Sequence, residues 1–173
     1  QLCYDGRIDR LNASKMLDTF QIRMAPYEDL SSHMKETDPI LYVDTQKLAG
    51  NTTDFIGDEV ACIDHHPTFV PMEYHYQDIR MVGACASLIA EYYVRSGNTP
   101  DRNVATALLY GIKMDTLQFT RGVTPLDIEM FGFLFPLCDQ EVLADLERNN
   151  MEFSDLKAYG EAIERIELYD KIG

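Results

Sequence analysis

The sequence is short of basic residues and of long apolar runs, and each shortage excludes a class of protein. Among its 173 residues, 29 are acidic and 15 are basic, which gives a formal net charge of -14. Proteins that grip duplex nucleic acid neutralise phosphates with many Lys and Arg side chains, so this charge argues against a duplex partner. The apolar runs at residues 105–112 and 131–137 are far shorter than the roughly 20 residues of a membrane-spanning helix. We therefore expect no membrane-spanning segment.

Cysteine is sparse and scattered. Cys3, Cys62, Cys85 and Cys138 form no CxxC pair, which argues against a zinc ribbon and against a disulfide framework. Reduced thiols fit this pattern best, and we predict a cytoplasmic protein. The remaining composition is that of an ordinary globular domain, with 46% hydrophobic residues.

Two short apolar runs end in polar residues and predict neighbouring parallel strands. Residues 39–43 are followed by Asp44, and residues 59–63 are followed by an Asp-His-His triplet. The carboxyl ends of parallel strands meet at one edge of an α/β sheet, and such sheets bind their ligands at that edge. The sequence therefore predicts a ligand site where these two strands end.

Helical spacing dominates the second half of the chain. Thr124 and Pro125 have the residue types that favour an N-cap and the first helical position. The expected fold class is α/β, a parallel sheet flanked by helices, with a helical C-terminal half. Amphipathic or capped helices are predicted near residues 12–17, 84–96, 101–115, 124 onward and 155–169, and further strands at 21–24 and within 71–80.

The Asp-His-His triplet gives the strongest chemical signal. Adjacent side chains of an extended strand point to opposite sides, so at most one of His65 and His66 is expected to bind a metal. These histidines could also be packing or surface residues, but Asp44 and Asp115 also end apolar elements, which favours a metal site. Carboxylates with one imidazole suit manganese or magnesium better than structural zinc. Asp64 would then orient one ring by a hydrogen bond.

Small residues open the helix that follows the predicted sheet. The segment 83–87 leaves the backbone N–H groups near Gly83 and Ser87 free to approach an anion, although close packing of helix on sheet would explain it equally well. Arg80 and Arg121 are the nearest basic residues and could contact phosphate or remain solvated. Neither Ser87 nor any cysteine lies in a nucleophile-elbow sequence, so we expect no covalent triad.

In their order along the chain and in their spacing, the motifs described above resemble those of the DHH phosphoesterase superfamily. The resemblance extends to residues 10–12 and is to the branch that contains nanoRNases and exopolyphosphatase-related proteins. It implies a parallel α/β fold, in agreement with the strand pattern. The motifs that carry it are Val43-Asp44-Thr45, Asp64-His65-His66, Gly83-Ala84-Cys85-Ala86-Ser87 and Gly111-Ile112-Lys113-Met114-Asp115-Thr116.

The resemblance also implies roles for individual residues. Asp44 would bridge two manganese ions, His65 and Asp115 would be further metal ligands, and His66 would contact the substrate phosphate. Magnesium or cobalt could take the place of manganese. The complete predicted site comprises catalytic His66 and Asp64, substrate-binding Gly83 and Ser87, and the metal ligands Asp44, His65 and Asp115.

Two features of the superfamily have no counterpart in this sequence. Its enzymes carry an earlier Asp-x-Asp motif, which Asp5 and Asp9 do not match, and a second, Gly-rich domain that grips the substrate. We therefore expect residues 1–173 to form a DHH-type domain that is incomplete at its N-terminus, lacks the second domain, and is weak or inactive by itself.

Two classes of function follow. The first is a metal-dependent phosphoesterase acting on short oligoribonucleotides, dinucleotides or nucleoside bisphosphates, with pyrophosphatase or exopolyphosphatase activity as its alternative. The second is a noncatalytic nucleotide-sensing or interaction domain. The expected partner is a small phosphorylated or short single-stranded nucleotide substrate, with no duplex nucleic acid and no membrane, and the chain could form a homodimer.

Overall fold

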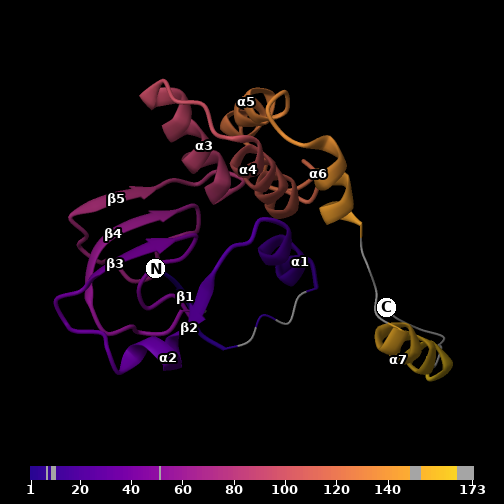
Figure 1. Cartoon of the computed structure of the whole chain (residues 1–173), viewed down its shortest axis with the longest axis horizontal. Coiled ribbons are helices and arrows are strands. Elements are labelled where there is room, and N and C mark those ends of the chain that lie inside the picture. Colours follow the sequence, from indigo (N-terminus) through magenta and orange to yellow (C-terminus); the bar gives the residue numbers. More distant parts are fainter. Residues whose placement is uncertain (7, 9–10, 51, 149–152, 167–173) are drawn as a thin grey trace, which may run out of the picture.

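The computed structural model describes residues 1–6, 8, 11–50, 52–148 and 153–166. Its elements alternate strand and helix at first and are helical after the last strand (Figure 1). The strands are β1 (Leu2–Tyr4), β2 (Met24–Pro26), β3 (Pro39–Val43), β4 (Asp58–Asp64) and β5 (Tyr76–Ile79). The helices are α1 (Leu11–Thr19), α2 (Tyr27–Ser31), α3 (Cys85–Ser96), α4 (Arg102–Asp115), α5 (Pro125–Leu134), α6 (Gln140–Glu147) and α7 (Phe153–Glu164).

All strand pairs in the described structure are parallel. Strands β3, β4 and β5 form one sheet in that order, and β1 pairs with β2 in a second sheet. The last residues of β4, from Cys62 to Asp64, are all buried, as expected for a parallel strand that is covered on both faces. The predicted fold class is confirmed, because parallel sheets are flanked by helices and the C-terminal half is helical.

Helices α3 to α6 bury the main hydrophobic core, and α3 joins it to the sheet. Leu88 of α3 packs with Ile63 of β4 and with Cys85 in a smaller cluster beside the sheet. Burial of each large aliphatic side chain contributes about 1.5–3 kcal/mol, so these contacts fix the helices against the end of β4. The fully buried large side chains of the main core are Leu109, Ile112, Met130, Leu134 and Leu146.

Most of the predicted elements are present. The helix predicted at 84–96 is α3, which ends at Gly97 in the left-handed conformation (φ 69°) that glycine adopts without strain. The helix predicted at 155–169 is α7, which begins at Phe153 and ends at Glu164, while residues 167–169 lie outside the described residues. The strand predicted at 21–24 corresponds to β2, which lies slightly later in the chain, from Met24 to Pro26. Strand β1 and helices α2 and α6 were not predicted, because three to eight residues carry too little periodicity.

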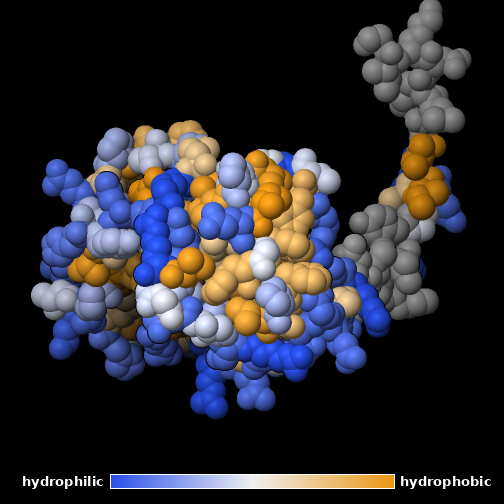
Figure 2. Space-filling model, turned by 90° about the horizontal axis from the view of Figure 1, so that it is seen from above, coloured by the Kyte–Doolittle hydropathy of each residue, from blue (hydrophilic) through white to orange (hydrophobic). Residues whose placement is uncertain are grey.

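The surface is mostly hydrophilic, with hydrophobic side chains gathered over α5 in the view of Figure 2. Ile128 and Phe135 are among the exposed hydrophobic residues there. In the described part of the chain, no helix is both long enough and apolar enough to cross a membrane.

Asp127 ties the start of α5 to the start of α3. Its buried carboxylate accepts hydrogen bonds from the Gly83 amide (2.9 Å), the Ser87 hydroxyl (2.6 Å) and the Thr124 amide (2.7 Å). Burial alone would raise the pKa of Asp127, but the hydrogen bonds from Ser87, Thr124 and Gly83 outweigh it and the pKa is lowered. Asp127 is therefore a charged anchor between two helices.

Replacing this anchor should destabilise the fold strongly. We expect Asp127→Ala to lower the free energy of unfolding by about 3 kcal/mol, because buried donors at Gly83 and Ser87 would lose their acceptor. Asp101→Ala is the matched control, since Asp101 caps α4 at an exposed position and its loss should cost only about 1 kcal/mol. Urea unfolding of both variants measures the difference, and equal losses would contradict the anchoring role.

Candidate metal centre

Asp44 follows the last residue of β3 and continues its pairing with β4. Its amide donates a hydrogen bond to the Ile63 carbonyl (2.9 Å), one step beyond the Val43–Ile63 register pair. Its backbone is left-handed, with φ 64°, a conformation that Asp tolerates better than most residues other than glycine. The side chain is half-exposed, so the carboxylate is accessible at the carboxyl edge of the sheet.

His65 faces Asp44 with one ring nitrogen and the protein backbone with the other. Its Nδ1 lies 3.0 Å from the Val82 carbonyl oxygen, which can only accept, so Nδ1 carries a hydrogen. Its Nε2 lies 3.2 Å from Asp44 Oδ1. The hydrogen bond to Asp44 raises the pKa of His65 to about 9, against the opposing effect of burial. The ring is therefore protonated at neutral pH when no metal is bound.

Asp64 orients His66. The Asp64 side chain is buried, and its Oδ1 lies 2.8 Å both from His66 Nδ1 and from the His65 amide. Its Oδ2 accepts a hydrogen bond from Gln46 Nε2 (2.7 Å). Burial would raise the pKa of Asp64, but the hydrogen bonds from Gln46, His66 and His65 lower it, so the carboxylate stays ionised. These distances fit the predicted role of Asp64 in orienting an imidazole ring, and the ring in question is that of His66.

Asp44, His65 and His66 come together at this edge. Each offers one ligand atom, and the three atoms lie within 4.8 Å of one another. The expectation that the two imidazoles point to opposite sides is wrong, because their ring centroids are 4.2 Å apart. The reason is local: β4 ends at Asp64, and the bonds that Asp64 accepts from both following residues bend the chain there.

Asp115, the last residue of α4, faces this group from a second direction. Burial and then the charge of Asp44 raise the pKa of Asp115, while His65 and His66 lower it, so the four side chains share one electrostatic environment. Asp115 is not among the residues whose ligand atoms lie within 4.8 Å of one another. Its role as a metal ligand stays a prediction.

The chain after Asp115 turns sharply. Leu117, Gln118 and Phe119 all have left-handed backbone conformations, with φ values of 46°, 55° and 64°. Buried Thr116 holds this turn, since its hydroxyl donates to the Ile112 carbonyl (2.6 Å) and accepts from the Phe119 amide (3.1 Å). Strained backbone of this kind often lies beside functional groups, here directly after a candidate ligand.

The two predicted substrate-binding residues lie behind the site. Gly83 and Ser87 both donate to Asp127, and a Cβ atom on Gly83 would come within 2.6 Å of Asp127 Oδ2. Their contacts with Asp127 of α5 account for both residues, so the packing involved is of helix on helix, and their contact with substrate stays a prediction. Arg80 is held by Asp78 and Glu91, at 2.6 Å and 2.5 Å.

Arg121 lies close to the candidate site. Its Nη2 donates a hydrogen bond to the Asp115 carbonyl (2.9 Å). Its charge also acts on the Asp115 carboxyl, where it lowers the pKa.

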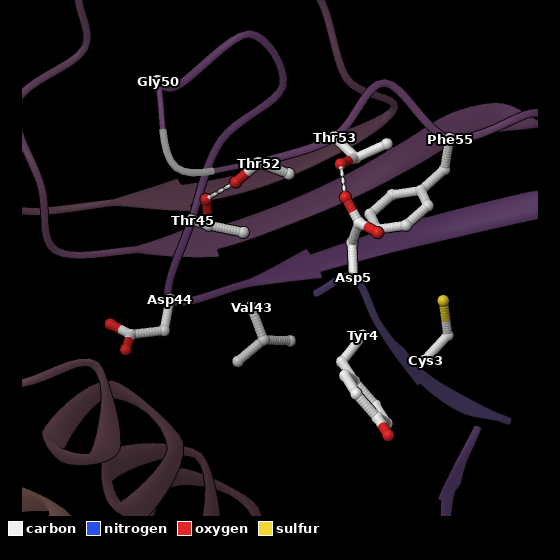
Figure 3. A pocket seen from close by; sticks show the side chains of 10 residues that line it. All are labelled: Cys3, Tyr4, Asp5, Val43, Asp44, Thr45, Gly50, Thr52, Thr53 and Phe55. Carbon is white, nitrogen blue, oxygen red and sulfur yellow. Dashed lines mark hydrogen bonds between the residues drawn. The ribbon is translucent and has the colours of Figure 1, made fainter. Parts of the chain in front are cut away.

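Sequence reasoning missed Gln46 and set Asp5 aside. Asp5 and Asp44 line the same pocket of about 630 Å³, although in Figure 3 their carboxylates point in different directions. Asp5 accepts a hydrogen bond from Thr53. A signal was present for Asp5, which follows β1 as Asp44 follows β3. No such signal existed for Gln46, because a single glutamine does not form a recognisable motif with its neighbours.

No protein-family model matches the chain. An uncharacterised protein of Methanocaldococcus jannaschii, MJ1633, is 28% identical over 163 residues, which are 94% of this chain and 33% of that protein. This chain therefore spans about one third of the length of that relative.

Two solved structures are similar in fold. One is a Methanococcus jannaschii protein assigned to the family II inorganic pyrophosphatases, with a TM-score of 0.60 and 22% identity over 78% of this chain and 48% of that one. The other is an exopolyphosphatase-related protein of Bacteroides fragilis, with a TM-score of 0.62 and 14% identity over 97% of this chain and 61% of that one. The chain therefore has the α/β fold of these two proteins.

The protonated state of His65 leads to a prediction about metal binding. A metal needs the neutral imidazole, so Mn²⁺ binding at pH 7 should release about one proton. The apparent affinity should rise by about tenfold per pH unit towards pH 9 and then level off, because the pKa of His65 is about 9. Calorimetry in buffers of different ionisation enthalpy measures the proton count.

Two variants test the assignment of this proton. His65→Ala should weaken Mn²⁺ binding and abolish the proton release. His33→Ala should bind like the wild type, because His33 lies outside the ligand group and its ring is hydrogen-bonded to Ser32. Indistinguishable titrations of the wild type and His65→Ala would remove His65 from the ligands.

Proposed function

We propose that the chain carries the site of a divalent-metal-dependent hydrolase of phosphate esters or anhydrides and belongs to the DHH superfamily. The observation that supports this most directly is the convergence of Asp44, His65 and His66 at the carboxyl edge of a parallel sheet. Open α/β sheets bind their ligands at this edge.

The residues present fit a hard divalent ion such as manganese. From this group Asp44 would supply a carboxylate and His65 an imidazole, and Asp115 is a further predicted carboxylate ligand, a set that suits manganese, with magnesium and cobalt as related choices. No cysteine belongs to this group among the described residues, and burial raises the pKa of Cys62 to about 11 and that of Cys85 to about 12. The hydrogen bond from His65 Nδ1 to the Val82 carbonyl leaves Nε2 as the ligand atom.

The charge of the chain favours such an ion for phosphate binding. With a net charge of -14 and Arg80 already paired with acidic residues, the positive charge that the described site offers to phosphate is that of Arg121. A bound cation is often the largest local charge in a site and reverses the sign of its field. When bound, a divalent ion also lowers the pKa of a water molecule and neutralises phosphoryl oxygens.

The residues around the ligands have separable tasks. Asp44 and His65 would hold the ion, and His66 would contact a phosphoryl oxygen. Asp64 keeps His66 in position, since the Nδ1 hydrogen bond directs the opposite ring nitrogen away from Asp64. Gln46 in turn holds Asp64, so the orientation of His66 depends on a chain of two hydrogen bonds, the first buried and the second partly buried.

The names of the two structural neighbours favour cleavage of phosphoanhydrides. One is assigned to the inorganic pyrophosphatases and the other is related to exopolyphosphatases. This supports the pyrophosphatase or exopolyphosphatase alternative better than the hydrolysis of oligoribonucleotides. Both classes of substrate place a phosphoryl group beside the metal, so the roles proposed for the four residues are common to them.

Asp44→Asn tests the proposal. Manganese-dependent hydrolysis should be measured as phosphate release from pyrophosphate and tripolyphosphate, and as shortening of a short oligoribonucleotide. We expect the variant to lose at least about 100-fold in kcat/KM, because the amide keeps the shape of the carboxylate but not its charge. Its free energy of unfolding should change by no more than about 2 kcal/mol.

The outcomes separate the alternatives. Normal turnover by a folded Asp44→Asn variant would exclude the metal-holding role of this residue. A wild-type protein that binds Mn²⁺ and phosphate compounds but neither releases phosphate nor shortens the oligoribonucleotide would instead support the noncatalytic sensing domain.

A further inference from the structure

The outer edge of β5 has no strand partner in the described structure. The sheet order is β3-β4-β5, so β5 pairs with β4 on one side and is the last strand on the other (Figure 1). The outer edge of β3 differs, because β1 residues and Val43 of β3 line the same pocket, so part of this chain already lies beside it. An unpaired strand edge is a template for pairing with another chain.

The hydrogen bonds to β4 determine which residues of β5 face outward. The Arg80 amide donates to the Asp64 carbonyl (3.0 Å), so the backbone of Arg80 faces β4. The backbone groups of successive residues in a strand point to opposite sides, so those of Ile79 and Gln77 point to the outer edge. This edge therefore offers the N–H and C=O groups of both residues to a further strand.

The sequence of this edge is complementary to itself. If two copies of β5 pair in antiparallel fashion about Ile79, each Ile79 lies opposite its counterpart and exchanges both backbone hydrogen bonds with it. The same register places Asp78 of each copy opposite Arg80 of the other, and opposite charges across two strands stabilise their pairing. A register centred on Gln77 would instead leave Arg80 without an acidic partner across the strands.

The charged side chains of this edge are already held in position. Arg80 binds Glu91 of α3 at 2.5 Å, and Asp78 accepts a hydrogen bond from Tyr92 of α3 at 2.7 Å. The charges of a second copy would extend this network, and exposed ion pairs contribute most when several charges join in one network. Met81, which is 68% exposed, adds an apolar side chain directly after the strand, and association would bury it.

We propose that the outer edge of β5 is the interface of a symmetric dimer, in which a second copy of this chain pairs antiparallel to β5 about Ile79. The two sheets then form one continuous sheet. The two-fold axis makes the same surface contact itself in both copies, so the interface closes and takes no third chain. The candidate metal centre lies at the ends of β3 and β4, outside this interface, so the dimer does not depend on the proposed function.

Ile79→Pro tests the pairing. Proline removes the outward amide of this residue but keeps the hydrogen bonds to β4, which its neighbours make, and an edge strand tolerates such a substitution. Size-exclusion chromatography with light scattering should show the wild type at twice the 19.8 kDa mass of one chain. The dissociation constant of the variant should be at least about tenfold higher, because two symmetry-related hydrogen bonds are lost.

Leu41→Pro is the matched control. Leu41 is exposed, and its backbone faces away from β4, since the Asp44 amide three residues later faces towards it. The control variant thus loses an outward amide from the other edge of the same sheet and should dimerise as the wild type does. Circular dichroism verifies that both proline variants are folded. A monomeric wild type, or a folded Ile79→Pro variant that dimerises normally, would overturn the proposal.

Cysteine substitutions test the register and remain decisive if Ile79→Pro does not fold. Ile79→Cys places two thiols opposite each other at a Cα separation of about 5.5 Å, which a disulfide can bridge. Mild oxidation should therefore link this variant into a covalent dimer. Gln77→Cys should give no more covalent dimer than the wild type, because position 77 faces position 81 of the other copy. Equal linking of the two variants, or none in Ile79→Cys, would overturn the pairing about Ile79.

Discussion

The parallel pairing of β3 with β4 determines the position of the candidate ligands. The hydrogen bond from the Asp44 amide to the Ile63 carbonyl extends the ladder past the last residue of β3. It places the Asp44 carboxylate against His65, which follows β4 by one residue. Because side chains alternate along a strand, a slip of one residue in this register would turn them to the other face. The site therefore depends on the register of two strands.

Much of this arrangement could be predicted from local patterns. Asp44 and the triplet each follow a short apolar run that predicts a parallel strand, so their meeting at one edge follows from parallel pairing. The expectation that both strands are buried is wrong for β3, where Leu41 and Val43 are exposed. The proximity of the two imidazole rings could not be predicted, because it results from a bend that the Asp64 hydrogen bonds impose. The tertiary role of Asp127 was equally hidden, because its capping position did not show that it also binds Gly83 and Ser87.

The site combines strained backbone with well-held side chains. Asp44 and the residues after Asp115 are left-handed, a conformation that costs residues other than glycine roughly 1–2 kcal/mol each. Hydrogen bonds and packing offset this cost, as when the Phe119 ring meets that of Phe131 edge to face at 5.1 Å. A hydrogen bond from Gln46 holds the Asp64 carboxylate in place. The geometry at the ligands is thus set by the fold before any ion or substrate arrives.

The central claim is that Asp44 and His65 hold a divalent ion. The most direct test is anomalous diffraction from crystals of the protein grown with Mn²⁺. The account predicts an anomalous peak at coordinating distance from an Asp44 carboxylate oxygen and from His65 Nε2, with His65 Nδ1 still bonded to the Val82 carbonyl. A peak elsewhere on the molecule, or no peak beside Asp44 when the protein is saturated with Mn²⁺, would contradict it.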